Sequence, residues 1–379
     1  ANGAVGREEI TMRAEQMELR DFRNLRETVW KPGPSVNVIW GENAQGKTNL
    51  LEALWLFTGS KSFRGARDRE LVALGRTDAR LSLKFQAEER EQEAVLKIGS
   101  RRTAELNGVP QTSASALAGR FCGVVFSPAH LTLIKGGPEE RRRFVDAAYC
   151  QLRPGYLRSL REYLRVLAQR NNLLKDCRGH GDPAGMLDIW DQRLAAAGIR
   201  LLRARAAYVE RLGPVAADIY GGLSAGKEDF EIQYQPAGIG LENTAGCDDR
   251  ILTEMLYRVL GKNRDADIAA GFTTAGPHRD DLEVRIGGLP ARIYGSQGQQ
   301  RSAVLALKLA EATLLRDVTG EQPVALLDDV MSELDASRQD YILNHIHDWQ
   351  VFITCCDPEP LRRMKGGVEF HMKQGVLGA

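Results

Sequence analysis

The chain reads Gly41-Glu42-Asn43-Ala44-Gln45-Gly46-Lys47-Thr48 directly after the apolar run Ser35-Val36-Asn37-Val38-Ile39-Trp40. The first stretch is a complete G-x-x-x-x-G-K-[ST] phosphate loop, and the second is typical of a buried strand. Apolar residues then keep helical spacing up to a break at Gly59: Leu50, Leu51, Leu54 and Phe57. Strand, glycine-rich loop and helix in this order predict an α/β fold with a phosphate site at a helix N-terminus.

The parts of the loop have distinct expected roles. Gly41 and Gly46 let backbone N–H groups approach a phosphate closely, where the helix dipole also favours negative charge. Lys47 is expected to reach the β- and γ-phosphates, and the Thr48 hydroxyl to ligate Mg²⁺. We therefore expect all residues from Gly41 to Asn49 to bind ATP, and Lys47 to take part in catalysis.

Two carboxylates follow a second apolar run, Val324-Ala325-Leu326-Leu327. Asp328 ends this predicted strand, so its side chain should emerge at the sheet edge where ligands bind, as a Mg²⁺ partner of Thr48. Asp329 stands where transporter ATPases usually carry a glutamate that orients and deprotonates water. Because aspartate is one methylene shorter, we expect Asp329 to be catalytic but hydrolysis to be slow. The alternative is that Asp329 only caps the following turn.

A third motif begins about 30 residues before the aspartate strand. Ser296-Gln297-Gly298-Gln299-Gln300 resembles the signature sequence of ABC-type ATPases. Ser296 and Gly298 are expected to face the γ-phosphate bound by a second copy, and a helix beginning near Gln299 to direct its positive end there. Ser332 and Asp335 are expected on the same dimer seam. The pattern predicts an ATP-dependent homodimer in which neither copy alone surrounds the nucleotide.

A helical segment interrupts the α/β pattern after Pro154. A first apolar stripe runs through Leu157, Leu160, Leu164, Leu167 and Leu174. A glycine- and proline-containing stretch, residues 179–183, separates it from a second stripe that is expected to end at Gly213-Pro214. The two stripes predict a short antiparallel helical hairpin.

Arginines occupy the predicted exposed positions of this hairpin, and they are either a solvated face or a phosphate-contacting stripe. On the first helix, Arg158, Arg161 and Arg165 are the candidate DNA contacts. Arg64 is a further candidate, for nucleotide or DNA phosphates, against the alternative of a plain surface loop. The other arginines assigned to exposed positions are Arg170, Arg193, Arg200, Arg203 and Arg205.

The composition is that of an ordinary globular chain of 379 residues, with 43% apolar residues, 27% charged residues and a formal net charge of +1. Any nucleic-acid surface must therefore come from local clustering of charge. The six cysteines form no C-x-x-C pair and are interpreted as reduced, buried thiols of a cytoplasmic protein, with no metal site built by side chains alone. Residues 1–11 are interpreted as a flexible extension or a remnant of cloning, with Met12 as the natural start.

Further motifs complete a resemblance to a known family. Together with the phosphate loop, the signature and the aspartate strand, they resemble the RecF family of bacterial replication and repair ATPases over essentially Met12 to the C-terminus. Ala129 departs from the acidic residue usual in the family, and Thr354 follows the last core strand where ABC transporters carry a switch histidine. His278 is expected to be structural. The motifs are Leu19-Arg20-Asp21-Phe22-Arg23-Asn24, Lys61-Ser62-Phe63-Arg64, Gly136-Gly137-Pro138 with Arg141, Arg142, Phe144, Val145 and Asp146, and Gly276-Pro277-His278-Arg279-Asp280-Asp281.

The resemblance implies an ABC-type, SMC-like P-loop ATPase head, residues 12–148 and 270–379, with an inserted mainly helical arm lobe, residues 149–269. It implies ATP-driven dimerisation on double-stranded DNA and at single-strand/double-strand junctions near gaps. It further implies slow, DNA-stimulated ATP hydrolysis with Mg²⁺, cooperation with RecR and RecO in loading RecA, and a place in the SOS response. The alternatives are a purely structural SMC-like tether, a transporter-type motor, and an ATPase-linked nuclease, for which about 45 residues after Asp335 are too few.

Overall fold

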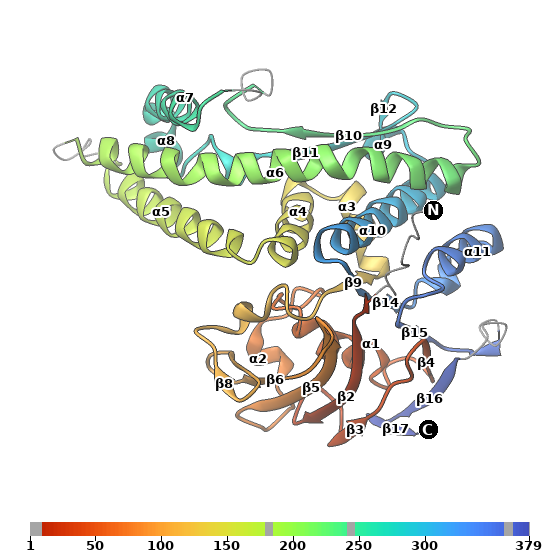
Figure 1. The fold of residues 1–379 in the computed structure, drawn as a ribbon. Coiled ribbons are helices and arrows are strands. Elements are labelled where there is room, and N and C mark those ends of the chain that lie inside the picture. Colours follow the sequence, from red (N-terminus) through yellow and green to blue (C-terminus); the bar gives the residue numbers. More distant parts are fainter. Residues whose placement is uncertain (1–9, 179–184, 241–246, 360–366, 379) are drawn as a thin grey trace, which may run out of the picture. The chain divides into compact units, whose positions relative to one another are not determined.

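The computed structural model describes residues 10–178, 185–240, 247–359 and 367–378 (Figure 1). The chain forms two compact units, Ala1–His130 with Leu305–Ala379, and Leu131–Val304. The boundaries of these units differ from those predicted for the ATPase head and the arm lobe. The head and arm lobe remain a prediction about function, whereas the two units are defined by packing. Within the described ranges, no helix has both the length and the apolar character that crossing a membrane requires.

The core of the first unit is a six-stranded sheet in which five neighbouring strands are parallel. Every residue of β14 (Val324–Asp328) and β15 (Val351–Cys355) is buried, as expected for parallel strands covered on both faces. The helix α1 (Lys47–Leu56) packs against these two strands, so the strands and helix predicted around the phosphate loop are confirmed. The sheet order is β17 (Val376–Gly378), β16 (Val368–Lys373), β4 (Val36–Trp40), β15 (Val351–Cys355), β14 (Val324–Asp328) and β9 (Gly123–Phe126).

A second six-stranded sheet of the first unit is antiparallel throughout. In its central strand β5, every second residue from Ala79 to Ala87 is buried, so one face packs on the core. Ile10 and Thr11, assigned from the sequence to a flexible extension, form β1 and pair with β13 (Glu321–Gln322). The strands are β3 (Thr28–Trp30), β2 (Arg13–Arg20), β5 (Ala79–Ala87), β6 (Arg90–Ile98), β7 (Thr103–Leu106) and β8 (Val109–Pro110), and the remaining helices are α2 (Asp68–Leu71) and α11 (Ala336–His345).

The second unit is mainly helical and is built along α6 (Met186–Ser224). The predicted end of this helix at Gly213-Pro214 is wrong, because α6 continues for ten residues past Pro214. A proline inside a helix costs about 3 kcal/mol, but burial of the last turns opposes this cost: Ile219 is buried, and Tyr220 stacks on Phe230 at 4.7 Å between ring centroids. The other helices are α3 (Thr132–Lys135), α4 (Pro138–Leu152), α5 (Tyr156–Asp176), α7 (Asp249–Lys262), α8 (Arg264–Ala270) and α9 (Ala291–Tyr294).

The helix α5 lies along α6, with the early residue Glu162 paired to Arg200 and the later residue Arg170 paired to Asp191. This register is that of two antiparallel helices; the stretch predicted to join them, residues 179–183, lies outside the described residues. The exposed positions assigned to Arg170 and Arg205 are wrong, since both side chains are buried. Leu164, placed in the apolar stripe, is 48% exposed, because the buried stripe of α5 runs instead through Tyr163, Leu167, Arg170 and Leu174.

A three-stranded antiparallel sheet covers part of α6. Its strands are β10 (Phe230–Gln235), β11 (Asp281–Ile286) and β12 (Leu289–Pro290). The helix that follows, α10 (Gln297–Thr319), begins in the second unit and ends in the first.

Candidate functional site

The phosphate loop has a backbone that only glycine adopts easily at two positions. Gly41 and Gly46 have φ angles of 151° and 119°, in the region that side chains disfavour. A Cβ atom at Gly41 would collide with the Met372 carbonyl oxygen, and one at Gly46 would lie 2.8 Å from a methyl group of Leu25. The loop is therefore closely packed, and α1 starts immediately after it at Lys47.

Lys47 is buried, and its ammonium group is held over the loop. Its Nζ donates to the carbonyl oxygens of Gly41 at 2.5 Å and Glu42 at 3.0 Å. Because both partners are neutral backbone groups, the positive charge of Lys47 faces no carboxylate in these contacts. An anionic ligand is the natural partner for such a cation at a helix N-terminus.

A pocket of about 520 Å³ opens beside the loop, within the size range of small-molecule sites. Polar groups of the loop form one part of it, and Val72 and the fully exposed Leu74 add apolar surface. We call this region the phosphate-loop pocket. It is lined by Arg23, Asn24, Asn43, Ala44, Gln45, Gly46, Lys47, Thr48, Asn49, Arg64, Glu70, Val72, Leu74 and Asp329.

Asp328 lies at the end of β14 and joins this region through Thr48. The Thr48 hydroxyl donates to Asp328 Oδ1 at 2.7 Å, as the sequence led us to expect for two Mg²⁺ partners. Burial raises the pKa of Asp328, although hydrogen bonds from Thr48 and Thr354 oppose that rise. A hydroxyl and a carboxylate oxygen close together are the hard oxygen donors that Mg²⁺ prefers, so the donor set fits this ion.

Asp329 follows in a strained backbone conformation, with a φ of 51°. Its N–H donates to the Thr354 hydroxyl at 2.9 Å, and its carbonyl oxygen accepts from the Ser332 hydroxyl at 2.9 Å. Its carboxylate lines the phosphate-loop pocket and has no hydrogen-bond partner in the part of the chain that the structure describes. The alternative in which this carboxylate caps the next turn therefore has no contact to support it.

Buried Glu52 of α1 organises two other motifs around the loop, a role that no sequence motif predicted. Its carboxylate accepts two hydrogen bonds from Arg23, both at 3.0 Å, and one from the Ser62 hydroxyl. Arg64 is exposed and donates to Asn49 Oδ1 at 2.8 Å, so it reaches the rim of the pocket. The sequence does carry a signal for this role: Glu52 is a charged residue within the apolar run of α1, and a buried charge requires polar partners.

The interpretation of all six cysteines as buried thiols is wrong for three of them, because Cys356 is exposed and Cys150 and Cys247 are only half-buried. The Sγ of Cys356 lies 3.7 Å from Lys47 Nζ and 3.2 Å from Asn43 Oδ1. The adjacent Cys355 is buried, and this burial raises the pKa of its thiol to about 12. The two neighbouring cysteines thus differ: one faces the phosphate loop and the other packs in the sheet.

The signature segment lies in the second unit and forms a reciprocal helix cap. The Ser296 hydroxyl accepts from the Gln299 N–H at 3.2 Å, and Gln299 Oε1 accepts from the Ser296 N–H at 2.7 Å. This cap starts α10 at Gln297, two residues before the predicted start. Ser296 and Gln297 are exposed, whereas Gln300 is buried and donates to the Ala291 carbonyl oxygen. The segment therefore presents a helix N-terminus with two exposed polar residues.

The remaining predicted site residues are surface groups. Asp335 caps α11 by accepting from the Arg338 N–H at 3.0 Å, a bond that lowers the pKa of its carboxyl group. Arg158, Arg161 and Arg165 belong to the second unit and are exposed on α5.

Two motifs quoted for the family resemblance pair with each other inside the second unit. Arg141 makes a bidentate contact with Asp281 at 2.6 and 3.0 Å, and Arg205 contacts both carboxylate oxygens of Asp146 at 2.8 and 2.9 Å. Arg170 adds contacts with Asp191 at 2.6 Å and Asp267 at 2.7 Å. The core ion-pair network, as we call it, consists of Arg141, Asp146, Arg170, Asp191, Arg205, Asp267, Asp280 and Asp281.

His278 lies beside this network and has structural contacts. Its ring nitrogens face the Tyr163 hydroxyl at 2.7 Å and the Thr273 carbonyl oxygen at 2.9 Å. Burial lowers the pKa of His278 to about 4, so the ring is neutral at physiological pH. These contacts are those of a half-buried histidine that joins segments of the fold.

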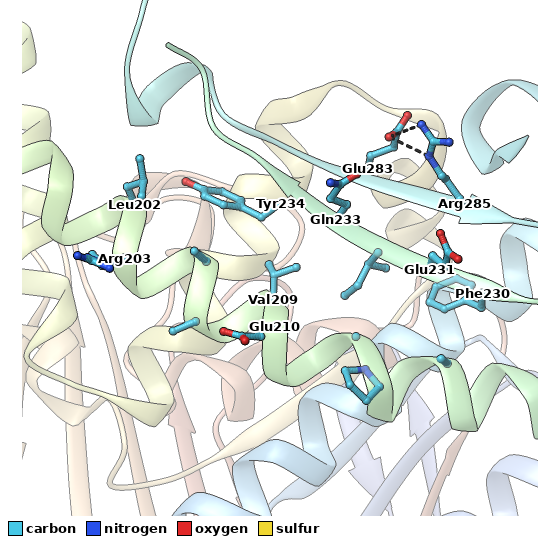
Figure 2. A pocket seen from close by; sticks show the side chains of 16 residues that line it. Leu202, Arg203, Val209, Glu210, Phe230, Glu231, Gln233, Tyr234, Glu283 and Arg285 are labelled. Atoms are coloured by element: carbon cyan, nitrogen blue, oxygen red, sulfur yellow. Dashed lines mark hydrogen bonds and ion pairs between the residues drawn. The ribbon is translucent and has the colours of Figure 1, made fainter. Parts of the chain in front are cut away.

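The second unit also contains a larger groove of about 1120 Å³ between α6 and the strands β10 and β11. Figure 2 shows Val209 and Glu210 on the α6 side and Phe230 and Glu231 on the β10 side, with a Glu283–Arg285 ion pair nearby. None of the residues that we predicted as site residues lines this groove. Its size alone assigns no chemistry to it.

Known proteins resemble this chain over nearly its full length. The model of the RecF/RecN/SMC N terminal domain matches residues 13–377. A DNA replication and repair protein RecF from Acetivibrio thermocellus is 37% identical and covers 96% of this chain and 98% of its own. A structure of the recombination mediator protein RecF-ATP in the RecFOR pathway is 33% identical, with a TM-score of 0.90, and covers 98% of this chain and 99% of its own. The Smc head domain of Pyrococcus furiosus, at 16% identity, a TM-score of 0.54 and coverage of 97% and 95%, is similar in fold.

Proposed function

Because the chain belongs to the RecF/RecN/SMC N-terminal domain family, and within it to the RecF proteins, we propose that it is an ATP-dependent DNA-binding clamp of replication and recombinational repair. The single observation that carries this proposal is the phosphate-loop pocket. There Lys47, the Thr48–Asp328 pair and the Asp329 carboxylate, which has no hydrogen-bond partner among the described residues, meet at a helix N-terminus. We place the protein in the cytoplasm, with residues 12–148 and 270–379 as the ATPase head and residues 149–269 as the arm lobe.

The chemistry follows from groups already in place. Lys47 exchanges its hydrogen bonds with two carbonyl oxygens for the phosphate oxygens of ATP, and the loop N–H groups hold the rest of the triphosphate. Thr48 and Asp328 hold Mg²⁺, which supplies charge neutralisation at the phosphates. The Asp329 carboxylate, which makes no hydrogen bond within the described residues, orients a water molecule and accepts its proton. Because this side chain is short, turnover is slow.

Dimerisation completes the site in this proposal. The capped N-terminus of α10, with Ser296 to Gln300, faces the γ-phosphate held by a second copy, and Ser332 and Asp335 lie along the seam. Occupancy of the pocket and pairing of two copies then stabilise each other by mass action. Hydrolysis removes the γ-phosphate and separates the copies.

DNA binding is proposed to use phosphate contacts from Arg64, Arg158, Arg161 and Arg165, all of which are exposed. Such contacts bind double-stranded DNA and single-strand/double-strand junctions with little sequence preference and weaken as salt rises. At a gap, the clamp cooperates with RecR and RecO to load RecA, as part of the SOS response. An SMC-like tether, by contrast, holds DNA equally with and without ATP.

Sedimentation of the full chain, with and without Mg²⁺–ATP and duplex DNA, tests this function. We expect the mass to double with ATP and DNA retention to rise. Lys47→Ala should lose nucleotide binding, whereas Ser296→Arg should bind ATP and stay monomeric. Ser100→Arg, at an exposed position of the first unit, is the matched control and should dimerise normally. An unchanged mass at saturating ATP, or equal DNA retention by Lys47→Ala, would overturn the clamp.

A further inference from the structure

Thr354 stands where ABC transporters carry a histidine, and it occupies a central position in the sheet. It lies inside β15, which runs to Cys355, rather than after the strand as expected. In the parallel register of the sheet, Thr354 is paired with Asp328 of β14. Its side chain is completely buried, so its hydroxyl must be satisfied by neighbouring protein groups.

The hydroxyl of Thr354 bonds to both aspartates of the phosphate-loop pocket. It donates to Asp328 Oδ1 at 3.0 Å and accepts from the Asp329 N–H at 2.9 Å. One hydroxyl can make both bonds because it has one proton and two lone pairs. The strand, the expected Mg²⁺ ligand and the expected catalytic carboxylate are thereby connected through one atom.

The two hydrogen bonds to Asp328 are directed at the same carboxylate oxygen. Thr48 donates to Oδ1 at 2.7 Å and Thr354 donates to it at 3.0 Å. Oδ2 has no hydrogen-bond partner among the residues described. A carboxylate held by one oxygen in this way presents the other in a defined direction, as a metal ligand requires.

The bond to Asp329 acts on a strained residue. A non-glycine φ of 51° is disfavoured and persists only where neighbouring groups hold it. The N–H···Oγ1 bond from Asp329 to Thr354 is such a restraint, and it sets the direction in which the Asp329 side chain leaves the backbone.

From this geometry we infer that Thr354 is a positioning residue for ATP hydrolysis: its hydroxyl orients the Asp328 carboxylate for Mg²⁺ and the Asp329 carboxylate for water. This inference rests on the proposed function. The competing explanation is that threonine is present only as a β-branched residue that packs well in a strand. Valine would fill the same space without the hydroxyl, whereas serine would keep the hydroxyl and lose the methyl group.

Three variants of the full chain separate these explanations. Thr354→Val removes the hydroxyl, and Thr354→Ser restores it. Thr58→Val is the matched control, because Thr58 is also buried in the first unit but its hydroxyl donates to the Trp55 carbonyl oxygen, at 2.8 Å, and not to an aspartate of the pocket. For each, we would measure ATP affinity with and without Mg²⁺, kcat and KM of hydrolysis, and thermal unfolding without nucleotide.

For Thr354→Val we expect kcat to fall and the gain in ATP affinity from Mg²⁺ to shrink, each by about 10- to 100-fold, the effect of removing groups that orient metal ligands. ATP affinity without Mg²⁺ should stay unchanged. Thr354→Ser should recover most of both losses, and Thr58→Val should alter only unfolding.

Equal kinetics and Mg²⁺ dependence for Thr354→Val and Thr58→Val would overturn the inference, as would a serine variant no better than valine. Lys47→Ala separates this failure from failure of the proposed function. If Lys47→Ala loses ATP binding while Thr354→Val is unaffected, only the inference on Thr354 fails. If Lys47→Ala binds and hydrolyses ATP normally, the proposed function fails as well.

Discussion

The phosphate-loop pocket of the first unit and the core ion-pair network of the second are both built from dense polar motifs, but their charges are paired differently. In the pocket, Lys47 contacts neutral carbonyl oxygens, and the Asp329 carboxylate has no hydrogen-bond partner among the described residues. In the network, Arg170 is fully buried between Asp191 and Asp267, which are fully buried too. Charged motifs thus mark a ligand site in one unit and an internal scaffold in the other.

The difference has a physical cause. A buried charge is tolerated only when partners replace its lost hydration, so each buried arginine of the network needs its own carboxylate partners. A pocket that binds a charged ligand must keep some charges uncompensated until the ligand arrives. We therefore expect changes in the network to act on stability, and changes in the pocket to act on ligand binding and even to stabilise the unliganded chain.

Arg170→Met should show the largest effect. Removing one partner of a buried ion pair typically costs about 3–5 kcal/mol, and here two carboxylates would lose their common partner. The measurement is the free energy of unfolding in urea, together with hydrogen exchange of α5 and α6. Arg165→Met, at an exposed position of the same helix, is the control and should change stability by less than about 0.5 kcal/mol. Similar values for both variants would contradict a structural role for the network.

Acid should destabilise the second unit through His278. Its folded-state pKa of about 4 lies below the ordinary value of 6.5, so the unfolded chain takes up the proton first as the pH falls. The contribution of the neutral ring to the free energy of unfolding is therefore complete above pH 6.5 and is lost as the pH falls towards 4. At about 1.4 kcal/mol per pKa unit, the full loss is about 3 kcal/mol. Hydrogen exchange of α5 and β11 across this pH range measures it within the second unit.

His278→Gln removes the titrating ring and should flatten this pH dependence. The measurement must follow the second unit alone, because half-buried His130 of the first unit, whose pKa is lowered to about 3, titrates in the same direction. A variant as acid-sensitive as the parent chain would show that His278 is not the group responsible.

The smallest predicted effect is a gain in stability of about 1 kcal/mol, opposite in sign to the losses predicted above. Burial and Asp329 raise the pKa of Asp328, so its charged form destabilises the unliganded chain above the ordinary carboxyl range. Asp328→Asn should therefore raise the unfolding temperature at pH 7.5 without nucleotide, with a smaller gain at pH 5, while abolishing Mg²⁺-dependent ATP binding. Asp335→Asn is the control, because the pKa of Asp335 is lowered and its replacement should give no gain. A lower unfolding temperature for Asp328→Asn would remove the distinction between pocket and network.

Local pattern was enough to predict the elements that hold the pocket. The strands around Val36 and Val324 and the helix after Gly46 follow from short apolar runs and glycine spacing, both of which act between near neighbours. The Thr48–Asp328 contact was also predictable, since the ends of parallel strands meet at one sheet edge. The role of the Thr354 hydroxyl was not predictable, because it depends on the register between β14 and β15. That register brings Thr354 to Asp328, which is 26 residues away in the sequence.

What the residue order alone established is the α/β class, the phosphate loop and the aspartate strand, because glycine geometry and strand burial are properties of short segments. Only the folded structure shows whether each charged side chain is exposed or buried, and which partners it has. Arg165 and Arg170 look alike on one predicted helix face, yet one is exposed and the other lies between two buried aspartates. The continuation of α6 past Pro214 was decided in the same way, by burial against residues distant in the sequence. Contacts between residues that are distant in the sequence determine whether a polar side chain is paired inside the core or left available to bind a ligand.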